Sequence, residues 1–520
     1  MKMNEQQREN KPSLVDLKLR SVYLYRASVK EVGGVRWGYI NAKGRSILPA
    51  IYDHAGDFQE NGLAIVRMMN HDGVIDSNGY FIVKPKYETI NPFFEGRATV
   101  FDHGRFKAID EMGTEITRKS YSFIGDYKEG RARAAITNAQ GNYVYGYLNR
   151  WGKEVIPLEF ESGNDFIEGK AIVKFKKGEF GLINLTGKML YSYTYSNVDH
   201  FGDGMLSFQK ESNGKYGYMD EQGHILISPM FSWTEPFING RAIVNMADDY
   251  KNLYGVIDKR GHFVVKANYQ SITNLRENRL AIGKAIDPDR PYLGLKYALA
   301  DTDGHMLTGF LYNHISEYKD GFASASNNHY TFFIDRNGKR AGGLPNVSGS
   351  GTLEFDRTVI RGEIDFRLFY FDKKGQLVWK QNDVIPLNSN YSVREKKYKP
   401  NKDYLVYYPE LQGVENASVN PKLMALAGVK EVSGNEQLES NYVGDFDVTF
   451  FKKNLVVIEI SGYDYPFGAS HGMPVKKYAH IDVLSGQFYH LKDLFKQGSD
   501  YVKFLSGTIA EKIKNDSTYS

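Results

Sequence analysis

The strongest constraint on this chain is a short pattern, an Asp or Asn followed three residues later by Gly, which occurs ten times. Successive glycines of the pattern are separated by 34 to 43 residues over most of the 520-residue chain. A nearly fixed interval of this length is typical of repeat architectures, in which each unit stacks on its neighbours to build a core. The ten pairs are Asn41/Gly44, Asp76/Gly79, Asp110/Gly113, Asn149/Gly152, Asn184/Gly187, Asp220/Gly223, Asp258/Gly261, Asp301/Gly304, Asp335/Gly338 and Asp372/Gly375.

Each repeat predicts three short strands. An aromatic–Gly pair with apolar neighbours comes first, and the Asp/Asn-x-x-Gly segment then fits a type I turn, because Asp and Asn accept backbone N–H groups and Gly tolerates positive φ. A second strand often contains proline, which places it at an edge or starts it at the proline. A four-residue segment then leads into a third strand. It consists of an acidic residue or Asn, then Gly, a residue with a long side chain, and Ala. Examples of the aromatic–Gly pair are Trp37-Gly38, Tyr145-Gly146 and Tyr216-Gly217. The prolines of the second strand include Pro49, Pro85, Pro157 and Pro229. The segment before the third strand reads Glu95-Gly96-Arg97-Ala98 or Glu129-Gly130-Arg131-Ala132 in two of the units.

Three features of the repeat also admit a functional interpretation. The Asp and Asn residues are candidate calcium ligands, but Asn replaces Asp in three units and turn geometry already explains the pair. The Arg and Lys residues that follow the second Gly are a candidate basic stripe, although a solvated or salt-bridged strand face is the simpler interpretation. The aromatic–Gly pairs are candidate carbohydrate platforms, yet core packing is expected for aromatic residues at strand positions.

Over Val32 to Lys380 the pattern resembles the WG-repeat family of bacterial proteins. The resemblance implies a β-repeat scaffold, often coupled to other modules, with no common catalytic activity. Some units depart from it: the third has Phe106-Lys107 where aromatic–Gly is expected, the seventh reads Asn278-Arg279-Leu280-Ala281, and the last decays like a capping repeat.

The fold class expected is mostly β, an array of about ten three-stranded repeats, open like a solenoid or propeller-like, followed by a small α+β domain. Ten units exceed the usual 4–8 blades of a propeller, which favours an open twisted array or a ring that uses only some units. We expect a polar leader at 1–27, the repeat array at 28–384 and the α+β domain at 385–520.

Composition narrows the function classes. Lys and Arg total 66 against 62 Asp and Glu, a net charge of +4 with both signs interspersed, so no nucleic-acid partner is expected. The chain has no cysteine, and no apolar run approaches the ~18 residues of a membrane helix, so no integral membrane segment is expected. The polar start, Met1 to Leu17, shows no signal peptide, which favours a cytoplasmic location.

After Lys380 the regular Asp/Asn-x-x-Gly repeat ends and the sequence pattern changes. Asn388 to Pro400 is polar and basic, as in a linker or an entering edge strand. Strands are expected at 403–411, 442–452, 455–461 and 478–483. A short helix is expected near 422–427 and a longer one at 500–514, where apolar residues recur at a spacing of four.

This C-terminal part resembles the extracytoplasmic module of PdaC-type peptidoglycan deacetylases and RsiV-like anti-sigma factors (DUF4163 and DUF3298 types). The matching segments are Tyr408-Pro409-Glu410-Leu411, Tyr463 to Gly472, Asp482 to Gly486 and Leu491 to Phe495. Members usually continue with a further half, so the resemblance implies a truncated module here. The resemblance implies a cell-envelope location and a binding role. In this loop Tyr463, Tyr465 and His471 are the candidate binding residues, because loops with aromatic residues and His favour recognition; the alternative for His471 is a structural histidine bonded to backbone.

The segment Gly468-Ala469-Ser470-His471-Gly472 matches the nucleophile elbow of hydrolases, but an elbow needs a helix directly after the serine, and the following residues alternate like a strand. No catalytic, metal-binding or cofactor-binding motif is found, so no enzyme activity, metal or cofactor is expected. The sequence predicts a non-enzymatic binding or scaffold protein with a protein or cell-wall glycan partner: peptidoglycan, a lytic enzyme or an envelope protein. The alternatives are an intracellular protein–protein interaction scaffold and an accessory domain of a glycan-modifying, deacetylase-type system.

Overall fold

The computed structural model describes residues 23–175, 178–249 and 252–515, which form two compact units. The first comprises the described residues up to 29 together with 36–381, and the second comprises 30–35 and 382 onward. The leader expected at 1–27 lies outside the described residues as far as residue 22. Its last three residues, Tyr25 to Ala27, belong instead to the first strand.

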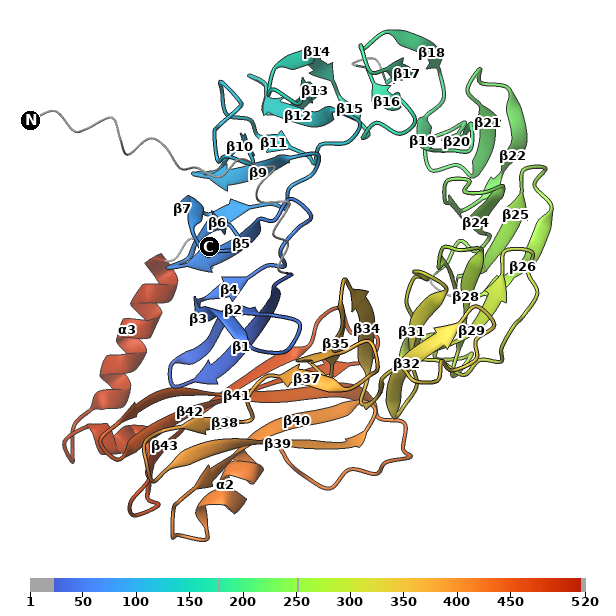
Figure 1. Ribbon diagram of the computed structural model, residues 1–520. Coiled ribbons are helices and arrows are strands. Elements are labelled where there is room, and N and C mark those ends of the chain that lie inside the picture. The colour runs from blue at the N-terminus through green and yellow to red at the C-terminus, as the bar shows by residue number, and fades with distance from the viewer. Residues whose placement is uncertain (1–22, 176–177, 250–251, 516–520) are drawn as a thin grey trace, which may run out of the picture. The chain divides into compact units, whose positions relative to one another are not determined.

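In the first unit, ten small antiparallel sheets form a ten-bladed β-propeller (Figure 1). Seven sheets have four strands and three have three, among the described residues. The expectation of three strands per unit was wrong for those seven, because a two- to six-residue strand precedes each Gly-x-Ala strand. The expectation of an open array was also wrong, because all ten units take part in one ring.

The first five blades contain the following strands: β1 (Tyr25–Glu31), β2 (Gly34–Ile40) and β3 (Ser46–Tyr52); β4 (His54–Ala55), β5 (Ala64–Met68), β6 (His71–Ile75) and β7 (Phe81–Tyr87); β8 (Thr89–Ile90), β9 (Arg97–Asp102) and β10 (Arg105–Asp110); β11 (Phe123–Ile124), β12 (Arg131–Thr137), β13 (Tyr143–Asn149) and β14 (Glu154–Phe160); β15 (Ser162–Gly163), β16 (Lys170–Lys174), β17 (Phe180–Asn184) and β18 (Met189–Tyr193).

The last five contain β19 (Asn197–Gly202), β20 (Met205–Gln209), β21 (Tyr216–Asp220) and β22 (Ile225–Phe231); β23 (Trp233–Thr234), β24 (Arg241–Asn245), β25 (Tyr254–Asp258) and β26 (Phe263–Tyr269); β27 (Ser271–Asn274), β28 (Arg279–Ala285) and β29 (Leu295–Asp301), with a 3₁₀ turn at Pro291–Leu293; β30 (His314–Ile315), β31 (Phe322–Ser326), β32 (Tyr330–Asp335) and β33 (Asn346–Ser348); β34 (Gly351–Asp356), β35 (Val359–Ile364), β36 (Arg367–Phe371) and β37 (Leu377–Lys380).

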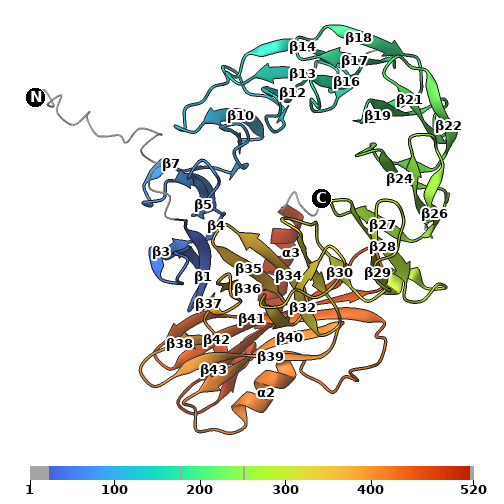
Figure 2. The ribbon, with the colours of Figure 1, turned by 45° about the vertical axis from the view of Figure 1, so that its right-hand side comes forward.

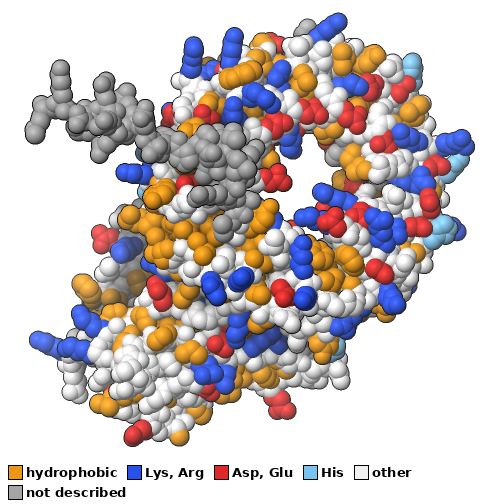
Figure 3. Space-filling view, in the orientation of Figure 1, with side chains coloured by type: hydrophobic (Ala, Val, Ile, Leu, Met, Phe, Trp, Pro, Cys, Tyr) orange, Lys and Arg blue, Asp and Glu red, His pale blue; other side chains and the backbone are white. Residues whose placement is uncertain are grey.

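The short first strand of a four-stranded blade lies toward the middle of the ring, and the last strand lies at its periphery (Figures 1 and 2). The middle of the ring is open in the space-filling view (Figure 3). Residues that directly follow the short strands therefore lie at the inner edge of the propeller.

The Asp/Asn-x-x-Gly segments are turns in all ten copies, as predicted. In the third unit, Gly113 donates its N–H to the carbonyl of Asp110 at 2.9 Å and has a φ of +75°. The Asp110 carboxylate accepts the N–H groups of Met112 and Thr114 at 2.9 and 2.8 Å. The recurring Asp or Asn is fully used in closing a hairpin, which leaves turn geometry as its explanation.

The glycine of the aromatic–Gly pair faces a bulge in the outermost strand. At Gly146 an added Cβ would lie 2.4 Å from the carbonyl oxygen of Pro157. The register there jumps by two residues on the outer strand, between the pairs Tyr145↔Phe160 and Tyr147↔Ile156. Pro157 lies inside this bulge, where the strand pairing needs no backbone N–H from it. The edge position predicted for the proline strand is confirmed, and a strand start at the proline is not observed.

Four blades replace this glycine. The ninth and tenth have Phe332 and Phe369 and keep a fourth strand, whereas the third and eighth lack the regular outer strand. The third blade has Lys107 and the eighth has Ala298, and both sheets stop at three strands. In the third blade the missing strand is reduced to isolated bridges, including Phe106↔Tyr121. A β-carbon at this position would collide with a bulged neighbour. The outer strands of the ninth and tenth blades accordingly pair with Phe332 and Phe369 without a register shift at these residues.

The basic residues of the Gly-Arg-Ala turns hold adjacent blades together. Arg131 donates two hydrogen bonds, at 3.0 and 2.7 Å, to the carbonyl of Leu185 in the turn of the next blade. Lys170 forms a 2.6 Å ion pair with Glu221 of its neighbour's turn. These side chains are therefore engaged between blades, and the alternative of a free basic stripe is wrong for them. Arg97, Arg241 and Arg279 make equivalent contacts with Arg150, Thr302 and Arg336.

The ring closes through side chains alone. The first blade consists of β1–β3 and the last of β34–β37, and no strand is shared between them. Tyr25 lies 5.5 Å from Tyr370 between ring centroids, and its hydroxyl is 2.7 Å from that of Thr358. The Tyr370 hydroxyl donates to the carbonyl of Arg26 at 2.9 Å. Ile40 and Val359 complete a small buried cluster at this seam.

The second unit contains a seven-stranded sheet in the order β38 to β44. Its strands are β38 (Val384–Pro386), β39 (Ser392–Asn401), β40 (Tyr404–Gln412), β41 (Ser440–Lys452), β42 (Leu455–Pro466), β43 (Met473–Asp482) and β44 (Phe488–Tyr489). Only β40 and β41 pair in parallel. The strand β39 replaces the linker interpretation of 388–400, because alternate residues such as Val393 enter the core.

Two α-helices are described in this unit. Helix α2 (Val419–Leu426) packs on the sheet core through Val419 and Leu423. Helix α3 (Tyr501–Asn515) confirms the helix expected at 500–514, and it buries no residue. A 3₁₀ segment at Leu491–Leu494 precedes it.

Candidate functional site

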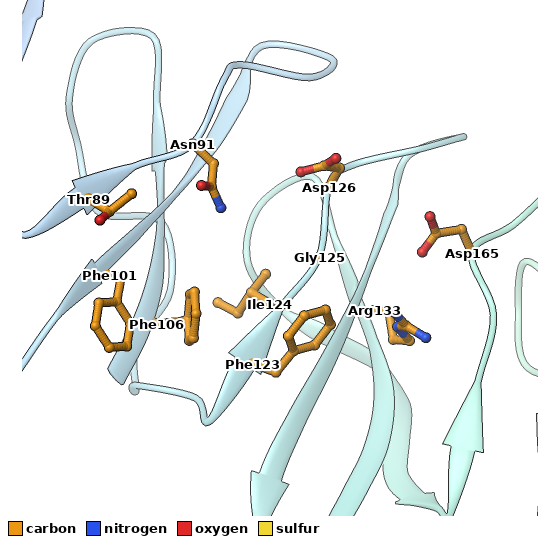
Figure 4. Close-up of a pocket in the computed structure, with 10 residues that line it drawn as sticks. All are labelled: Thr89, Asn91, Phe101, Phe106, Phe123, Ile124, Gly125, Asp126, Arg133 and Asp165. Carbon is orange, nitrogen blue, oxygen red and sulfur yellow. The ribbon is translucent and has the colours of Figure 1, made fainter. Parts of the chain in front are cut away.

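A pocket of the propeller lies between its third and fourth blades (Figure 4). Its volume is about 540 Å³. Strands β8 to β12 supply most of the wall, and the residue two positions after β15 adds one side chain. The lining residues are Thr89, Asn91, Phe101, Phe106, Phe123, Ile124, Gly125, Asp126, Arg133 and Asp165.

One wall of the pocket is aromatic. The ring centroids of Phe101 and Phe106 are 4.8 Å apart, and those of Phe106 and Phe123 are 6.2 Å apart. All three rings are half-buried, so each keeps an accessible part. The row links two blades, since Phe106 belongs to β10 and Phe123 to β11 (Figure 4). Half-exposed aromatic rings of this kind offer a large apolar contact area to a ligand.

Arg133 continues the wall into the fourth blade. Its guanidinium carbon lies 5.1 Å from the ring centroid of Phe123 and 5.8 Å from that of Tyr145, within cation–π range. The guanidinium also donates a hydrogen bond to the carbonyl of Gly163. Its Nε is buried and finds no hydrogen-bond partner in the described part of the chain.

The opposite side of the pocket carries two carboxylates, Asp126 and Asp165 (Figure 4). Asp165 is paired with Lys128 at 2.7 Å. Burial raises the pKa of Asp126, the Lys128 ammonium lowers it, and the charge of Asp165 raises it further. No hydrogen bond or ion pair is recorded for the Asp126 side chain among residues 23–175, 178–249 and 252–515. With Lys128 paired to Asp165 and the Arg133 guanidinium in the lining, the four charges of the pocket balance, and its carboxylates lie opposite an aromatic wall.

The C-terminal hairpin β42–β43 contains the residues predicted as a binding site. The Tyr463 hydroxyl accepts the N–H of Gly472 at 2.8 Å, and the Tyr465 hydroxyl donates to the carbonyl of Ala469 at 2.8 Å. Both tyrosines therefore fix the hairpin turn with their hydroxyls, while the Tyr463 ring remains 45% exposed. His471 is exposed, and its Nδ1 is 3.0 Å from the Ser470 hydroxyl rather than from a backbone group. A role in binding remains a prediction for all three.

The Gly-x-Ser-x-Gly segment occupies the turn of the same hairpin. The strand β43 begins at Met473, directly after Gly472. A nucleophile elbow needs a helix there, so this segment lacks the elbow geometry, as the sequence indicated.

Two searches of the described residues gave negative results. No group of three or more His, Asp or Glu side chains is placed to hold a metal ion in residues 23–175, 178–249 and 252–515. Within the same ranges, no helix is both long and apolar enough to cross a membrane.

Six segments of the chain match the family model "WG containing repeat". They are residues 37–70, 73–105, 145–178, 180–216, 216–250 and 254–284. The similarity to the WG repeat is shown for these six segments. Each match begins at, or one residue before, the glycine of the aromatic–Gly position. These glycines are Gly38, Gly73, Gly146, Gly181, Gly217 and Gly255. The repeat expected at the third position, with Lys107, falls in the gap between the second and third WG matches.

No curated protein matches the chain. Among solved structures, a eukaryotic initiation factor has a TM-score of 0.42 at 12% identity, covering 61% of this chain and 95% of that one. BamB from Moraxella catarrhalis has a TM-score of 0.28 at 11% identity, with 63% and 98% coverage. A DUF3298-family protein from Pseudomonas aeruginosa has a TM-score of 0.18 at 16% identity, with 24% and 66% coverage. These scores are too low to support a common fold or function.

The pocket coincides with the interruption in the run of WG repeats. Phe106, Phe123, Asp126 and Arg133 all lie within 106–144, the stretch between two matched repeats. Sequence reasoning identified none of the pocket residues. Two signals pointed to them: the Lys107 substitution and the 39-residue interval from Gly113 to Gly152, which is longer than its neighbours.

Proposed function

We propose that this protein is a non-enzymatic interaction scaffold whose propeller binds a partner protein at the pocket between the third and fourth blades. The observation that carries this proposal is the position of the pocket. The six blades that match the WG model keep the glycine and an outer strand, whereas the pocket adjoins the third blade, which has Lys107 and no regular outer strand. A propeller is a rigid support for such a site, because each blade is fixed by its two neighbours.

The chemistry of the wall supports a protein partner. Protein interfaces depend on a few buried aromatic anchors surrounded by polar groups. The row of Phe101, Phe106 and Phe123 offers such an anchor, and Asn91 with Asp126 supplies polar groups opposite it. The pocket is large enough for one or two side chains and too small for a folded domain.

A photo-crosslinking experiment tests this proposal. The intact chain carries p-benzoylphenylalanine in place of Phe106 and is irradiated in the cells that make it. We expect a covalent adduct with a defined protein, identified by mass spectrometry. The matched control places the same group at Phe263, which is 36% exposed on the outer strand of the seventh blade. No adduct at 106, or the same adducts at both positions, would contradict a partner-binding pocket.

For the second unit, we propose binding of a cell-envelope component: peptidoglycan, a lytic enzyme or an envelope protein. The support is the motif resemblance of the hairpin that contains Tyr463, Tyr465 and His471. The alternative is an intracellular scaffold that uses only the propeller. Fractionation of the native cells distinguishes the two, since an envelope-binding protein must be found outside the cytosol. With envelope material as the probe, His471→Ala should bind at least threefold more weakly than Ser470→Ala, and equal retention of both would overturn a role for His471.

A further inference from the structure

We propose that a second pocket between the third and fourth blades binds an acidic side chain of a partner protein, with an apolar neighbour of that residue packed on Trp151. This inference goes beyond the proposed function, because the second pocket shares no lining residue with the pocket that contains Phe106. Its volume is about 590 Å³. Three observations support it: an exposed tryptophan, a hollow beside an irregular segment of the third blade, and an excess of hydrogen-bond donors.

The tryptophan lies in the turn of the fourth blade. Trp151 is the third residue of the Asn149–Gly152 turn, and its ring is 70% exposed. The turn does not need an aromatic residue there, because eight of the ten turns have a polar or charged residue at this position. These residues are Lys43, Asn78, Thr186, Gln222, Arg260, Asp303, Asn337 and Lys374. Exposed tryptophan is the residue type most enriched among the side chains that dominate protein interfaces.

The hollow lies where the third blade lacks a regular outer strand. The segment between the isolated bridges at Glu115 and Tyr121 takes the place of this strand. The turn of the fourth blade packs closely against it, since an added Cβ on Gly152 would lie 2.4 Å from the carbonyl oxygen of Ile116. Trp151 and the irregular segment therefore line one hollow at the edge of the two blades.

The charged groups of this pocket do not balance. Lys119 pairs with Glu154 at 2.7 Å, and the Tyr121 hydroxyl donates to the same carboxylate at 2.8 Å. The side chains of Arg118 and Lys153 have no ion pair or hydrogen bond within residues 23–175, 178–249 and 252–515. Three cations and one carboxylate give the lining a net charge of +2. The unused groups are therefore donors, and the lining has no second carboxylate to accept from them.

A carboxylate with an apolar neighbour satisfies both parts of the pocket. Arg118 and Lys153 can donate charge-assisted hydrogen bonds to it, which are stronger than bonds between neutral groups. The indole of Trp151 supplies apolar contact area beside these donors. A nucleic acid fits less well, because its binding depends on many phosphate contacts and the pocket has only two unpaired cations.

Peptide binding to the intact chain tests the inference. The probe is a fluorescein-labelled 12-residue peptide with the repeat glutamate–leucine–serine, and a glutamine–leucine–serine peptide serves for comparison. Fluorescence anisotropy should show saturable binding of the glutamate peptide and at least about fivefold weaker binding of the glutamine peptide. Trp151→Ala should weaken binding of the glutamate peptide about tenfold. Both Trp151 and Arg118 are exposed, so Trp151→Ala and Arg118→Gln should leave thermal unfolding unchanged, which separates loss of binding from loss of folding.

Lys153→Gln and Lys188→Gln are matched variants. Both lysines are exposed and directly follow the glycine of an Asn-x-x-Gly turn, and each donates its backbone N–H to the turn asparagine at 3.0 Å. Only Lys153 lines the pocket. Lys153→Gln should weaken binding about fivefold, and Lys188→Gln about twofold or less.

Four outcomes would overturn the inference. Equal effects of Lys153→Gln and Lys188→Gln would mean non-specific attraction, and equal binding of the two peptides would exclude a carboxylate as the recognised group. The absence of saturable binding of the glutamate peptide would exclude an acidic occupant. A labelled thymidine 12-mer bound as tightly as the glutamate peptide would replace the acidic protein segment by a nucleic acid.

Discussion

The second and third blades are neighbours built from one repeat, yet their outer edges differ. The second has Gly73 and a complete outer strand, β7, whose carbonyl at Val83 would lie 2.7 Å from an added Cβ. The third has Lys107 and only isolated bridges. The comparison shows that the bulged outer strand fits where the neighbouring strand has glycine, which carries no side chain, at this position. In the third blade the glycine and the regular outer strand are both missing, and the pocket lies beside this blade.

The largest effect should come from filling the space above the bulge. Gly146→Val would place a β-carbon 2.4 Å from the Pro157 carbonyl, and such overpacking costs about 3 kcal/mol. We expect a clear fall in the midpoint of thermal unfolding by calorimetry. Ala298→Gly, in a blade without the regular outer strand, should cost about 1 kcal/mol or less. Equal losses for both variants would remove the distinction between the two kinds of blade.

A second test uses a half-buried carboxyl of the seventh blade, which keeps its glycine at Gly255. Burial raises the pKa of Glu235 to about 7. The folded state therefore holds this proton more tightly than the unfolded chain, whose Glu titrates near pH 4.3. Stability is greatest below that value and falls as the pH rises through about 7.

Glu235→Gln should consequently be more stable than the parent by about 1 to 2 kcal/mol at pH 8, after allowance for solvent screening. At pH 4 the two proteins should unfold at the same temperature. Glu317→Gln, at an exposed site of the ninth blade, is the control and should show no such pH dependence. A stability difference for Glu235→Gln that does not change between pH 4 and pH 8 would contradict the prediction.

The smallest effect on stability should come from removing the hydroxyl group of Tyr147. Tyr147 is buried and donates to the carbonyl of Asn164 at 2.7 Å, a contact made also by Tyr39 and Tyr218 in other glycine-bearing blades. The third blade has Ala108 at the corresponding position. Tyr147→Phe leaves a carbonyl unsatisfied and should cost about 1 kcal/mol in urea unfolding. The control Tyr143→Phe, at a 51% exposed ring of the same strand, should be neutral, and a comparable loss there would argue against a specific hydrogen bond.

The sequence predicted the features that depend on a few adjacent residues. The ten turns, the edge position of Pro157 and the helix at Tyr501–Asn515 follow from local rules on φ, hydrogen-bond donors and apolar spacing. Ring closure could not be predicted in this way. It depends on a small rotation between blades summed over ten units, and on a seam where Tyr25 meets Tyr370, two residues 345 positions apart.

The candidate site was missed for a related reason. Phe106 and Asp165 come from different repeats and become neighbours only through the packing of blades. Their residue types also fit a strand core or a surface turn, so neither stands out alone. The replacement of glycine by Lys107 was visible in the sequence, and only the structure showed that an outer strand is lost there.

Because the ring closes without a shared strand, each blade of the propeller is a separate unit of the chain. Every blade is made from one uninterrupted stretch of chain, so duplication or deletion of one such stretch leaves all remaining strand pairings intact. A propeller that borrows a terminal strand must preserve the distant pair with each change of length. This one must preserve only a face-to-face seam, and its number of blades is therefore free to change by whole units during evolution.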